Sequence, residues 1–461
     1  MTARTLILCF VAILLTGLPV VAQDSGDGTG SASATSEAAQ GGADYGMGLG
    51  LGVQSFTDPD SGDTETYQSL SLRPDFAIGK FGIGLDVTLN YRFTGGESGN
   101  EFQVREEDWV PDDDTNFFEL YLPKIQYLRW GRKGDPLYVQ AGGLNNATLG
   151  NGFIVGGYSN AQFLPNRRIF GLAFDMDGKL FDFPYVGVET FAANLAAFDV
   201  MGGRLYTRPL VPTEIAVLED LQIGTTFVAD TQPFYHASKD PTYTGPANAD
   251  NDVLMWGVDF RQPILSNPAI SLAVFGDYVR QDEANGAMLG TGGRLVRFIT
   301  YGAQLRFIGE NFIPTYFDST YDLSRVEQYA IYTSEQTVVK QHMGWLASAG
   351  FSLLQDRLVF NTTMEGPIGT DSGTYPKLRS SFRLEQGIVP GVSLQANYTK
   401  RRLEEPADVF SAENAVIGAQ VNYQTGPAVI SLIYDLEYDP YAQDDSPWDV
   451  TSRLETSISL F

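Results

Sequence analysis

Several segments alternate between apolar residues and small, polar or charged ones, and their charged side chains fall on the polar face, where residues lining an aqueous passage would lie. In Phe81–Phe93 the odd positions are apolar, and the even ones are small, polar or charged. Charges of both signs on such a wall can set up a transverse field that acts on a permeating solute. Equally, they can pair with one another and fill the interior, and the sequence leaves both interpretations open. The candidate pore-lining residues are Asp86, Arg92, Asp259, Arg261, Arg306, Arg379, Arg383, Glu385, Arg453 and Glu455.

Residues suited to catalysis or metal binding are scarce. The two histidines, His236 and His342, have no acidic, serine or asparagine partners at a spacing that would build a hydrolytic site. Asp58, Asp60 and Asp63 superficially resemble a calcium loop, but the order of the glycine and the third acid is wrong. We interpret them as solvated loop charge, or as groups that bridge surface lipopolysaccharide through divalent cations. We therefore predict no enzymatic activity, no metal site and no cofactor.

The segment Asn145–Arg168 differs from the other long polar stretches, because it has no acidic residue and several apolar ones. A loop folded against an inner wall would bury those residues and satisfy its backbone through Asn and Gly turns. We predict that it folds inward to narrow the passage, against the glycine-rich faces of 46–50 and 82–84. The competing interpretation is that Gly152–Tyr158 extends a strand. The candidate constriction residues are Leu149, Asn151, Phe153, Tyr158, Asn160, Arg167 and Arg168.

The elements that carry these residues alternate with a period of two, which is typical of β-strands with one apolar and one polar face. Phe81–Phe93 exceeds the roughly 9–11 residues that a tilted strand needs to cross a membrane. The alternation recurs in the segments 254–261, 299–307, 345–353, 392–399 and 417–423. The stretches 205–211 and 312–316 are the weakest strand candidates.

Short turns alternate with long polar stretches along the chain. Gly79-Lys80 and Thr425–Pro427 are examples of the first, and Thr94–Asn116, Thr231–Asn251 and Tyr438–Trp448 of the second. This asymmetry between two rims is typical of outer-membrane barrels, whose long loops face outside. The sequence predicts an all-β fold: a single transmembrane antiparallel β-barrel of roughly 18–20 strands, with short periplasmic turns and long extracellular loops.

The N-terminus has the features of a secretory signal peptide. Arg4 is followed by the apolar run Leu6–Leu15 and by the small residues Val20-Val21-Ala22. That run is too short for a spanning helix. We predict a signal peptide over 1–22, a flexible Gly/Ser/Ala leader over 23–44 and the barrel over 45–461.

The composition agrees with an exported β-protein. The 461 residues include 49 Gly, 29 Phe and 23 Tyr, a mixture that favours β structure. The net charge of −26 argues against nucleic-acid partners, which need clustered Lys and Arg. The only cysteine, Cys9, lies in the predicted signal peptide.

Aromatic residues gather at strand ends, among them Tyr91, Phe93 and Tyr398, where a girdle at the lipid interface would place them. A soluble β-sandwich or propeller also alternates, but exposed apolar faces on this scale would make a soluble monomer aggregate. In these features the chain resembles porin-like bacterial outer-membrane barrels. Such barrels end in an aromatic residue preceded by apolar residues at every second position. Phe461 supplies the aromatic terminus, whereas Leu454 and Ile458 fall in the opposite phase.

The resemblance implies the outer membrane of a Gram-negative-type bacterium, contact with its lipid and lipopolysaccharide, and insertion by barrel-assembly machinery. It also implies a channel for passive diffusion of small polar or charged solutes. The alternative is a non-conducting surface barrel that presents acidic loops for binding or shielding. The sequence leaves the solute, the ion preference and assembly into a homo-oligomer open.

Overall fold

The fold is described from a computed structural model of the chain. It covers residues 43–459 except 58–63, 97–98, 112–114, 164–166, 216, 240–242, 247, 268, 370–371, 412 and 439–447. The predicted signal peptide, most of the leader, the acidic triplet Asp58, Asp60 and Asp63, and Phe461 lie outside the described residues. In the part of the chain that is described, no helix is both long and apolar enough to span a membrane.

Strands dominate the chain, and few helices interrupt them. The first strands are β1 Ala43–Thr57, β2 Thr64–Ile78, β3 Phe81–Leu85, β4 Val87–Gly96, β5 Gly99–Val104, β6 Ile125–Trp130, β7 Leu137–Gly142, β8 Gly171–Asp177, β9 Val186–Ala192, β10 Val200–Thr207 and β11 Gln222–Asp230. The others are β12 Val253–Ser266, β13 Ser271–Gln281, β14 Ala284–Leu295, β15 Ile299–Ile308, β16 His342–Leu353, β17 Leu358–Pro367, β18 Lys377–Val389, β19 Val392–Lys400, β20 Ala415–Thr425, β21 Ala428–Tyr438 and β22 Trp448–Ser459. The α-helices are α2 Phe117–Tyr121 and α3 Tyr321–Tyr332, and the 3-10 helices are η1 Glu106–Asp108, η2 Leu122–Lys124, η3 Gly178–Phe181, η4 Val211–Thr213, η5 Ala237–Lys239 and η6 Pro406–Phe410.

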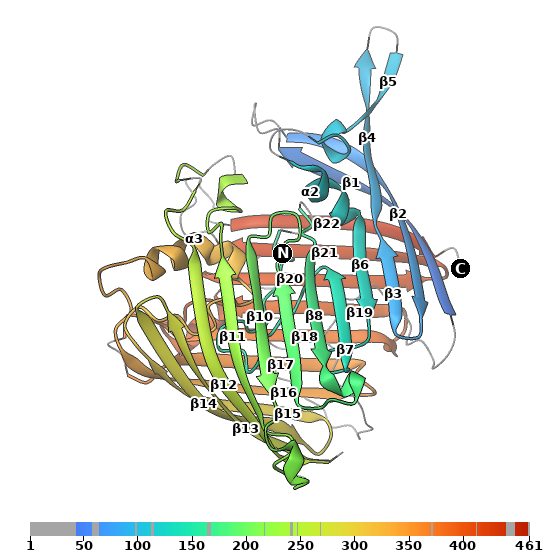
Figure 1. The fold of residues 1–461 in the computed structure, drawn as a ribbon. Helices are drawn as coiled ribbons and strands as arrows, with labels where there is room; N and C mark the ends of the chain where they lie inside the picture. Colours follow the sequence, from blue (N-terminus) through green and yellow to red (C-terminus); the bar gives the residue numbers. More distant parts are fainter. Residues whose placement is uncertain are drawn as a thin grey trace.

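The strands pair antiparallel with their neighbours along the chain, and β22 pairs with β1, so the sheet closes on itself (Figure 1). The segments β3 and β4 both pair with β2 and form one strand interrupted at Asp86. The segments β5 and β6 lie on the other side of that strand and form the next one. The chain is therefore a closed barrel of 20 strands, and the predicted fold class and strand number are confirmed.

The two rims differ as the sequence predicts. Two-residue turns such as Gly79-Lys80 occur at one rim, where Gly79 takes the left-handed conformation with φ of 56°. The long connections 143–170, 231–252 and 309–341 lie at the other rim.

Two predictions need correction. The stretch Thr94–Asn116 is not simply a loop, because β4 and β5 continue the wall as a hairpin that projects beyond the rim (Figure 1).

The second correction concerns 312–316, which is no strand but part of the connection 309–341. The stretch 205–211, by contrast, begins in β10 and ends in η4. The strand β1 begins at Ala43, two residues before the predicted start of the barrel.

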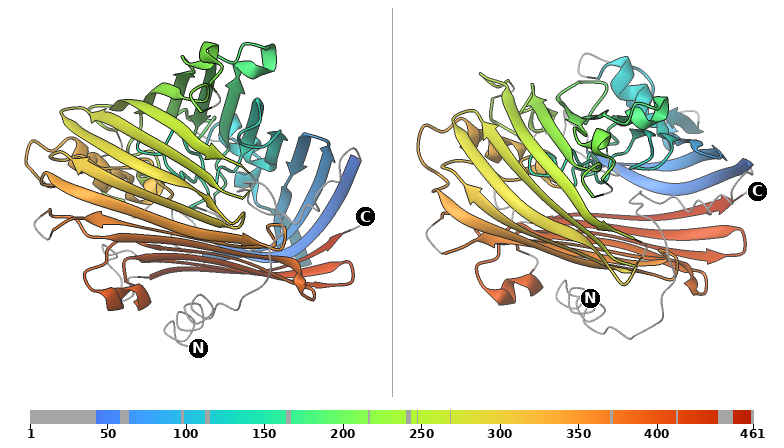
Figure 2. Two further views of the ribbon diagram at one scale, coloured as in Figure 1. Left: turned by 90° about the horizontal axis from the view of Figure 1, so that it is seen from below. Right: turned by 60° about the horizontal axis from the view of Figure 1, so that its bottom comes forward.

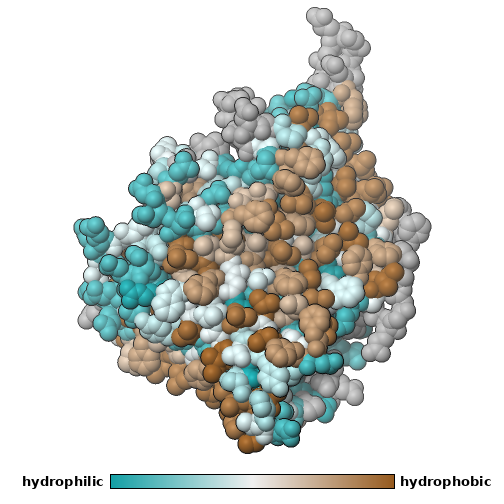
Figure 3. All heavy atoms as spheres, in the orientation of Figure 1, coloured by the Kyte–Doolittle hydropathy of each residue, from teal (hydrophilic) through white to brown (hydrophobic). Residues whose placement is uncertain are grey.

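The outer wall is apolar, as the alternation requires. In β12, Leu254, Trp256, Val258 and Phe260 are exposed, whereas Met255, Gly257 and Asp259 between them are buried. Leu432 and Leu454, paired across β21 and β22, are also exposed. Hydrophobic residues spread over the face that carries β6–β12 (Figure 3). A closed barrel with this outward belt has the architecture of an outer-membrane barrel.

The hydrophobic core lies inside the barrel. Its members come from the connections 143–170 and 309–341 and from inward-facing positions of β8–β15: Leu149, Phe153, Ile154, Val155, Tyr158, Val228, Val253, Met255, Phe275, Val279, Met288, Phe312, Tyr316, Phe317 and Tyr321 among others. Green and orange coil segments accordingly run within the curved sheet in Figure 2. The two connections, which we call the first and second inward loops, thus share one core with the wall.

Candidate functional site: the barrel interior

Ion pairs that include predicted residues form three groups on the inner wall, and the first joins β9, β10 and β12. Arg204 donates to Asp259 through Nε at 2.9 Å and to Glu189 through Nη1 at 3.2 Å. Only 2% of the Arg204 side chain is exposed. The candidate Asp259 is therefore neutralised in the wall. Sequence reasoning missed Arg204, although it alternates with Leu205 in the way that marked the other candidates.

The second group links the wall to the second inward loop. Glu365 on β17 accepts hydrogen bonds from Arg306 on β15 and from Arg379 on β18, the latter at 3.0 Å. Arg379 also donates to Asp318 at 3.3 Å. Arg306 lies 5.6 Å from the ring of Phe153 in the first inward loop. Two candidate arginines thus hold loops against the wall, and Glu365 and Asp318 are the partners that sequence reasoning missed.

The third group surrounds Asp86, at the interruption between β3 and β4. Arg168 donates to Asp86 at 2.8 Å, which ties the end of the first inward loop to the wall. Arg73 lies 3.3 Å from Asp86 and donates to Glu455 at 3.1 Å. Three predicted residues, Asp86, Arg168 and Glu455, therefore belong to one network, whose central residue, Arg73, was not predicted.

The remaining candidates are dispersed. Arg92 lies where β4 leaves β2, at the long-loop rim, and pairs with Glu65 at 2.5 Å. Arg92 therefore lies at the base of the hairpin that β4 forms with β5. Arg383 and Glu385 lie 3.6 Å apart on β18, with 21% and 36% of their side chains exposed. The side chain of Arg453 is outside the described part of the chain.

The predicted constriction loop lies inside the barrel. Leu149, Phe153 and Tyr158 are buried, with at most 4% of each exposed. The rings of Phe153 and Phe312 pack in a tilted arrangement with their centroids 5.5 Å apart, and the backbone N–H of Thr315 donates to the carbonyl of Phe153 at 2.9 Å. Gly152–Tyr158 forms isolated bridges rather than an extended strand.

The polar residues of this loop attach it to several strands. Asn151 donates to Asp277 at 2.9 Å and accepts from Arg261 at 3.5 Å. The buried Asn160 donates to the carbonyl of Ala193 at 2.9 Å and accepts from the N–H of Leu144 at 2.8 Å. Asn160 thus links the segments that directly follow β7 and β9 by hydrogen bonds.

The expected packing of the loop on the glycine faces is wrong. A Cβ atom at Gly84 would lie 2.6 Å from the ring of Tyr127, so this glycine makes room for a wall side chain. The loop packs instead against β9–β15, where inward-facing residues such as Val228 and Met255 are buried. Apolar inward positions on those strands were the signal that could have located it.

A buried charge cluster, unforeseen from the sequence, fixes the second inward loop. Arg325 of α3 donates to Asp230 of β11 through Nε at 2.6 Å and to Asp199 through Nη1 at 2.8 Å. Tyr321 also donates to Asp230. Each of these side chains is essentially inaccessible to solvent. The helix α3 is therefore attached to the wall by a buried, hydrogen-bonded ion pair.

The same cluster reaches the first inward loop. Tyr158 donates to Asp322 at 2.9 Å, and His236 Nε2 lies 3.6 Å from the other carboxylate oxygen of Asp322. Arg167 contacts His236 Nδ1 at 2.9 Å. Burial opposes ionisation of Asp322, but His236, Arg325 and the Tyr158 hydroxyl outweigh it and hold the pKa of Asp322 below its ordinary value.

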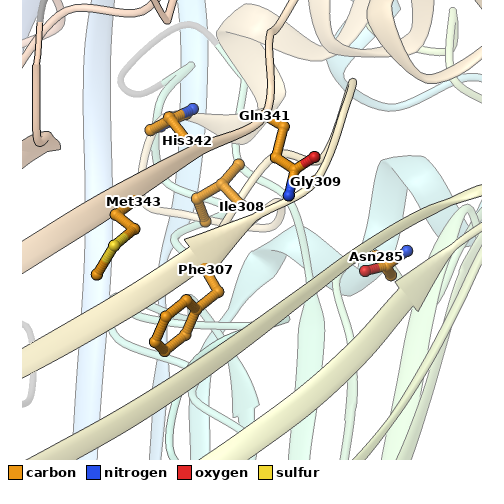
Figure 4. Close-up of a pocket in the computed structure, with 7 residues that line it drawn as sticks. All are labelled: Asn285, Phe307, Ile308, Gly309, Gln341, His342 and Met343. Atoms are coloured by element: carbon orange, nitrogen blue, oxygen red, sulfur yellow. The ribbon is translucent and has the colours of Figure 1, made fainter.

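Two further features lie apart from these networks. A hollow of about 380 Å³ at the long-loop rim is lined by Asn285, Phe307, Ile308, Gly309, Gln341, His342 and Met343, none of them a candidate pore residue (Figure 4). Within the described residues, no three His, Cys, Asp or Glu side chains are grouped so as to hold a metal ion.

No family model matches the sequence, and no curated protein matches it. Among solved structures, the chain is similar to OpdL of Pseudomonas aeruginosa, with 10% identity and a TM-score of 0.31 over 91% of this chain and 99% of that one. OccK2 (OpdF) of the same organism, in complex with glucuronate, has 9% identity and a TM-score of 0.31 over 91% and 97%. OpdK with vanillate has 11% identity and a TM-score of 0.32 over 91% and 98%. Such scores are low, and the fold rests on the strand pairing of this chain itself.

Proposed function

We propose that this chain is an outer-membrane channel through which small polar or charged solutes diffuse passively. The observation that carries the proposal is the division of the barrel interior into two halves. On β11–β13 the inward residues Val228, Met255 and Val279 are buried beneath the inward loops. On β17 and β19 the inward residues Asn361 and Asn397 are exposed.

Because those exposed residues face the inside of a closed barrel, solvent reaches that half of the interior. The neighbouring inward residues Ser381, Gln395 and Gln420 are partly accessible as well, and all are polar. A wall of neutral amides and hydroxyls with a few charges suits hydrated solutes, since it offers hydrogen bonds without binding tightly. The inward loops occupy the opposite half and would set the width of the passage.

The alternative is a non-conducting barrel that presents acidic loops. One observation favours it: the inward loops form a packed core with buried ion pairs, as a permanent plug would. A measurement of conductance distinguishes the two functions.

Purified protein reconstituted in planar bilayers should give stepwise conductance in the channel case. A detergent gel checks the folded state independently, because an unheated sample of a folded barrel migrates differently from a heated one. Folded protein that gives no conductance steps at any applied voltage would exclude the channel and leave the surface barrel.

A further inference from the structure

Two neighbouring turns at the short-turn rim carry a set of exposed large apolar side chains. One turn, 178–185, joins β8 to β9, and the other, 208–221, joins β10 to β11. Both lie at the lower ends of their strands in Figure 1. Between 37% and 66% of each side chain is exposed, and we call this set the turn patch: Leu180, Phe181, Phe183, Ile215, Val217 and Leu218.

The two turns are held together as one surface. The backbone N–H of Arg208 donates to the carbonyl of Tyr185 at 2.7 Å, and its guanidinium donates to the carbonyl of Pro184 at 3.0 Å. Lys179 Nζ lies 4.0 Å from the carboxylate of Asp220. The exposure of the turn patch is therefore a property of an ordered surface rather than of two separate loops.

Elsewhere on this rim, the described residues of each turn include at most one exposed large apolar side chain: Ile270 in 267–270, Val296 in 296–298 and Leu354 in 354–357. Four further turns have none. The connections 79–80, 131–136, 390–391 and 426–427 consist only of Gly, Pro, Lys, Arg and Asp. Such turns suit an aqueous compartment. An exposed cluster of aromatic and aliphatic side chains at one sector of the rim instead marks a surface that is covered in the functional state.

The lengths of the strands above the turn patch indicate what covers it. The strands β8 and β9 have seven residues each, and β10 has eight, whereas β1 and β2 have 15. The neighbouring strands β6 and β7 are also short, with six residues each, but the turn 131–136 between them carries no large apolar side chain. Seven residues rise about 23 Å along the strand, and a tilt of about 40° reduces this to about 18 Å along the barrel axis. The apolar band of such barrels is about 25 Å tall. These strands are too short to supply it alone.

We propose that the turn patch inserts into the periplasmic leaflet and completes the lipid-facing belt below β8–β11, in contact with phospholipid acyl chains. The outward residues directly above it, Leu205 and Ile223, are exposed and apolar, so the patch continues an existing lipid-facing surface. Charged residues such as Lys179 and Asp220 lie beside it, where they reach the headgroups. The proposal rests on the membrane location of the barrel, not on its conductance.

Spin labels at single cysteines test the proposal. In a full-length Cys9→Ser background, Phe181→Cys and Val217→Cys are labelled with a nitroxide in vesicles of phosphatidylethanolamine and phosphatidylglycerol. The accessibility of each label to oxygen, which partitions into lipid, is compared with its accessibility to a water-soluble nickel chelate. Gln355→Cys, an exposed position in another turn of this rim, is the matched aqueous control. Phe227→Cys, exposed outward on β11, is the lipid control.

Labels at 181 and 217 should resemble the label at 227, with an oxygen-to-nickel accessibility ratio several-fold above that at 355. Nickel accessibility as high as at 355 would show that the turns lie in water and overturn the proposal. Protection from both reagents would indicate coverage by protein and overturn it too. If the label at 227 also lies in water, the membrane barrel itself fails, which separates the two conclusions.

Discussion

Replacing Arg325 by methionine tests whether the buried charge cluster holds the second inward loop in the barrel. Only 1% of the Arg325 side chain is exposed, and it pairs with Asp199 and Asp230 at 2.5–2.8 Å. Methionine keeps most of the volume but leaves both carboxylates buried without their cation. Removing one partner of a buried ion pair costs about 3–5 kcal/mol. That is enough to detach α3 from the wall.

A matched exposed pair provides the control. Arg402 pairs with Glu404 at 2.8 Å, but about half of each side chain is exposed, 47% and 56%. Such pairs contribute about 0–1 kcal/mol, so Arg402→Met should have little effect. The triple variant Arg325→Met, Asp199→Asn, Asp230→Asn should recover most of the loss, because neutral amides remove the unpaired buried charges.

Limited proteolysis of the folded protein in detergent is the assay. In Arg325→Met, cleavage within 309–341 should occur while the barrel still migrates as folded on an unheated gel. Wild type and Arg402→Met should resist. If Arg325→Met resists cleavage as well as wild type does, the ion cluster does not hold the loop and the reasoning is wrong.

Three further outcomes are expected. Leu394→Arg places a charge on the outward face, which costs about 2–4 kcal/mol at the bilayer centre, and should impair assembly. The variant Gln395→Arg at the neighbouring inward position should assemble. Equal migration of the two variants on unheated gels would contradict the assignment of these residues to opposite faces of the wall. Arg168→Met should free the end of the first inward loop from Asp86 and raise single-channel conductance. The barrel should still assemble, since Arg73 continues to pair with that carboxylate. Unchanged conductance would show that this contact does not help to narrow the passage. The pKa of Asp322 is lowered in the folded protein, so its contribution to stability is complete above the ordinary carboxyl range of about 4 and is lost as the pH falls through the folded pKa. The urea midpoint of unfolding should therefore fall more steeply in acid for wild type than for Asp322→Asn. Midpoints that fall in parallel for the two proteins would contradict this role of Asp322.

The facing of the wall could be predicted from the sequence because strand side chains alternate strictly. Once Phe81–Phe93 is taken as a strand, Leu85 and Asp86 must point to opposite sides, and only one side of a membrane barrel accepts a charge. The unusual composition of Asn145–Arg168 likewise indicated an inward fold, because exposed apolar residues in a loop gain nothing from water. Both inferences depend only on local sequence.

The partners of those residues could not be predicted. Arg204 and Asp259 are separated by 55 positions, and Arg325 and Asp199 by 126. Their meeting depends on the register between strands and on where the second inward loop folds back. The stretch 312–316 shows the limit most clearly: its aromatic residues resemble a strand, and only the presence of Phe153 and Tyr158 beside them makes them a core.

Sequence alone therefore determined the closed barrel and the two faces of its wall, since both follow from alternation and from the cost of placing charge in lipid. The tertiary structure decided which charges are neutralised, which half of the interior is filled and how long each strand is. Those features depend on contacts between segments far apart in the chain, and on the relative heights of strands that no single segment specifies.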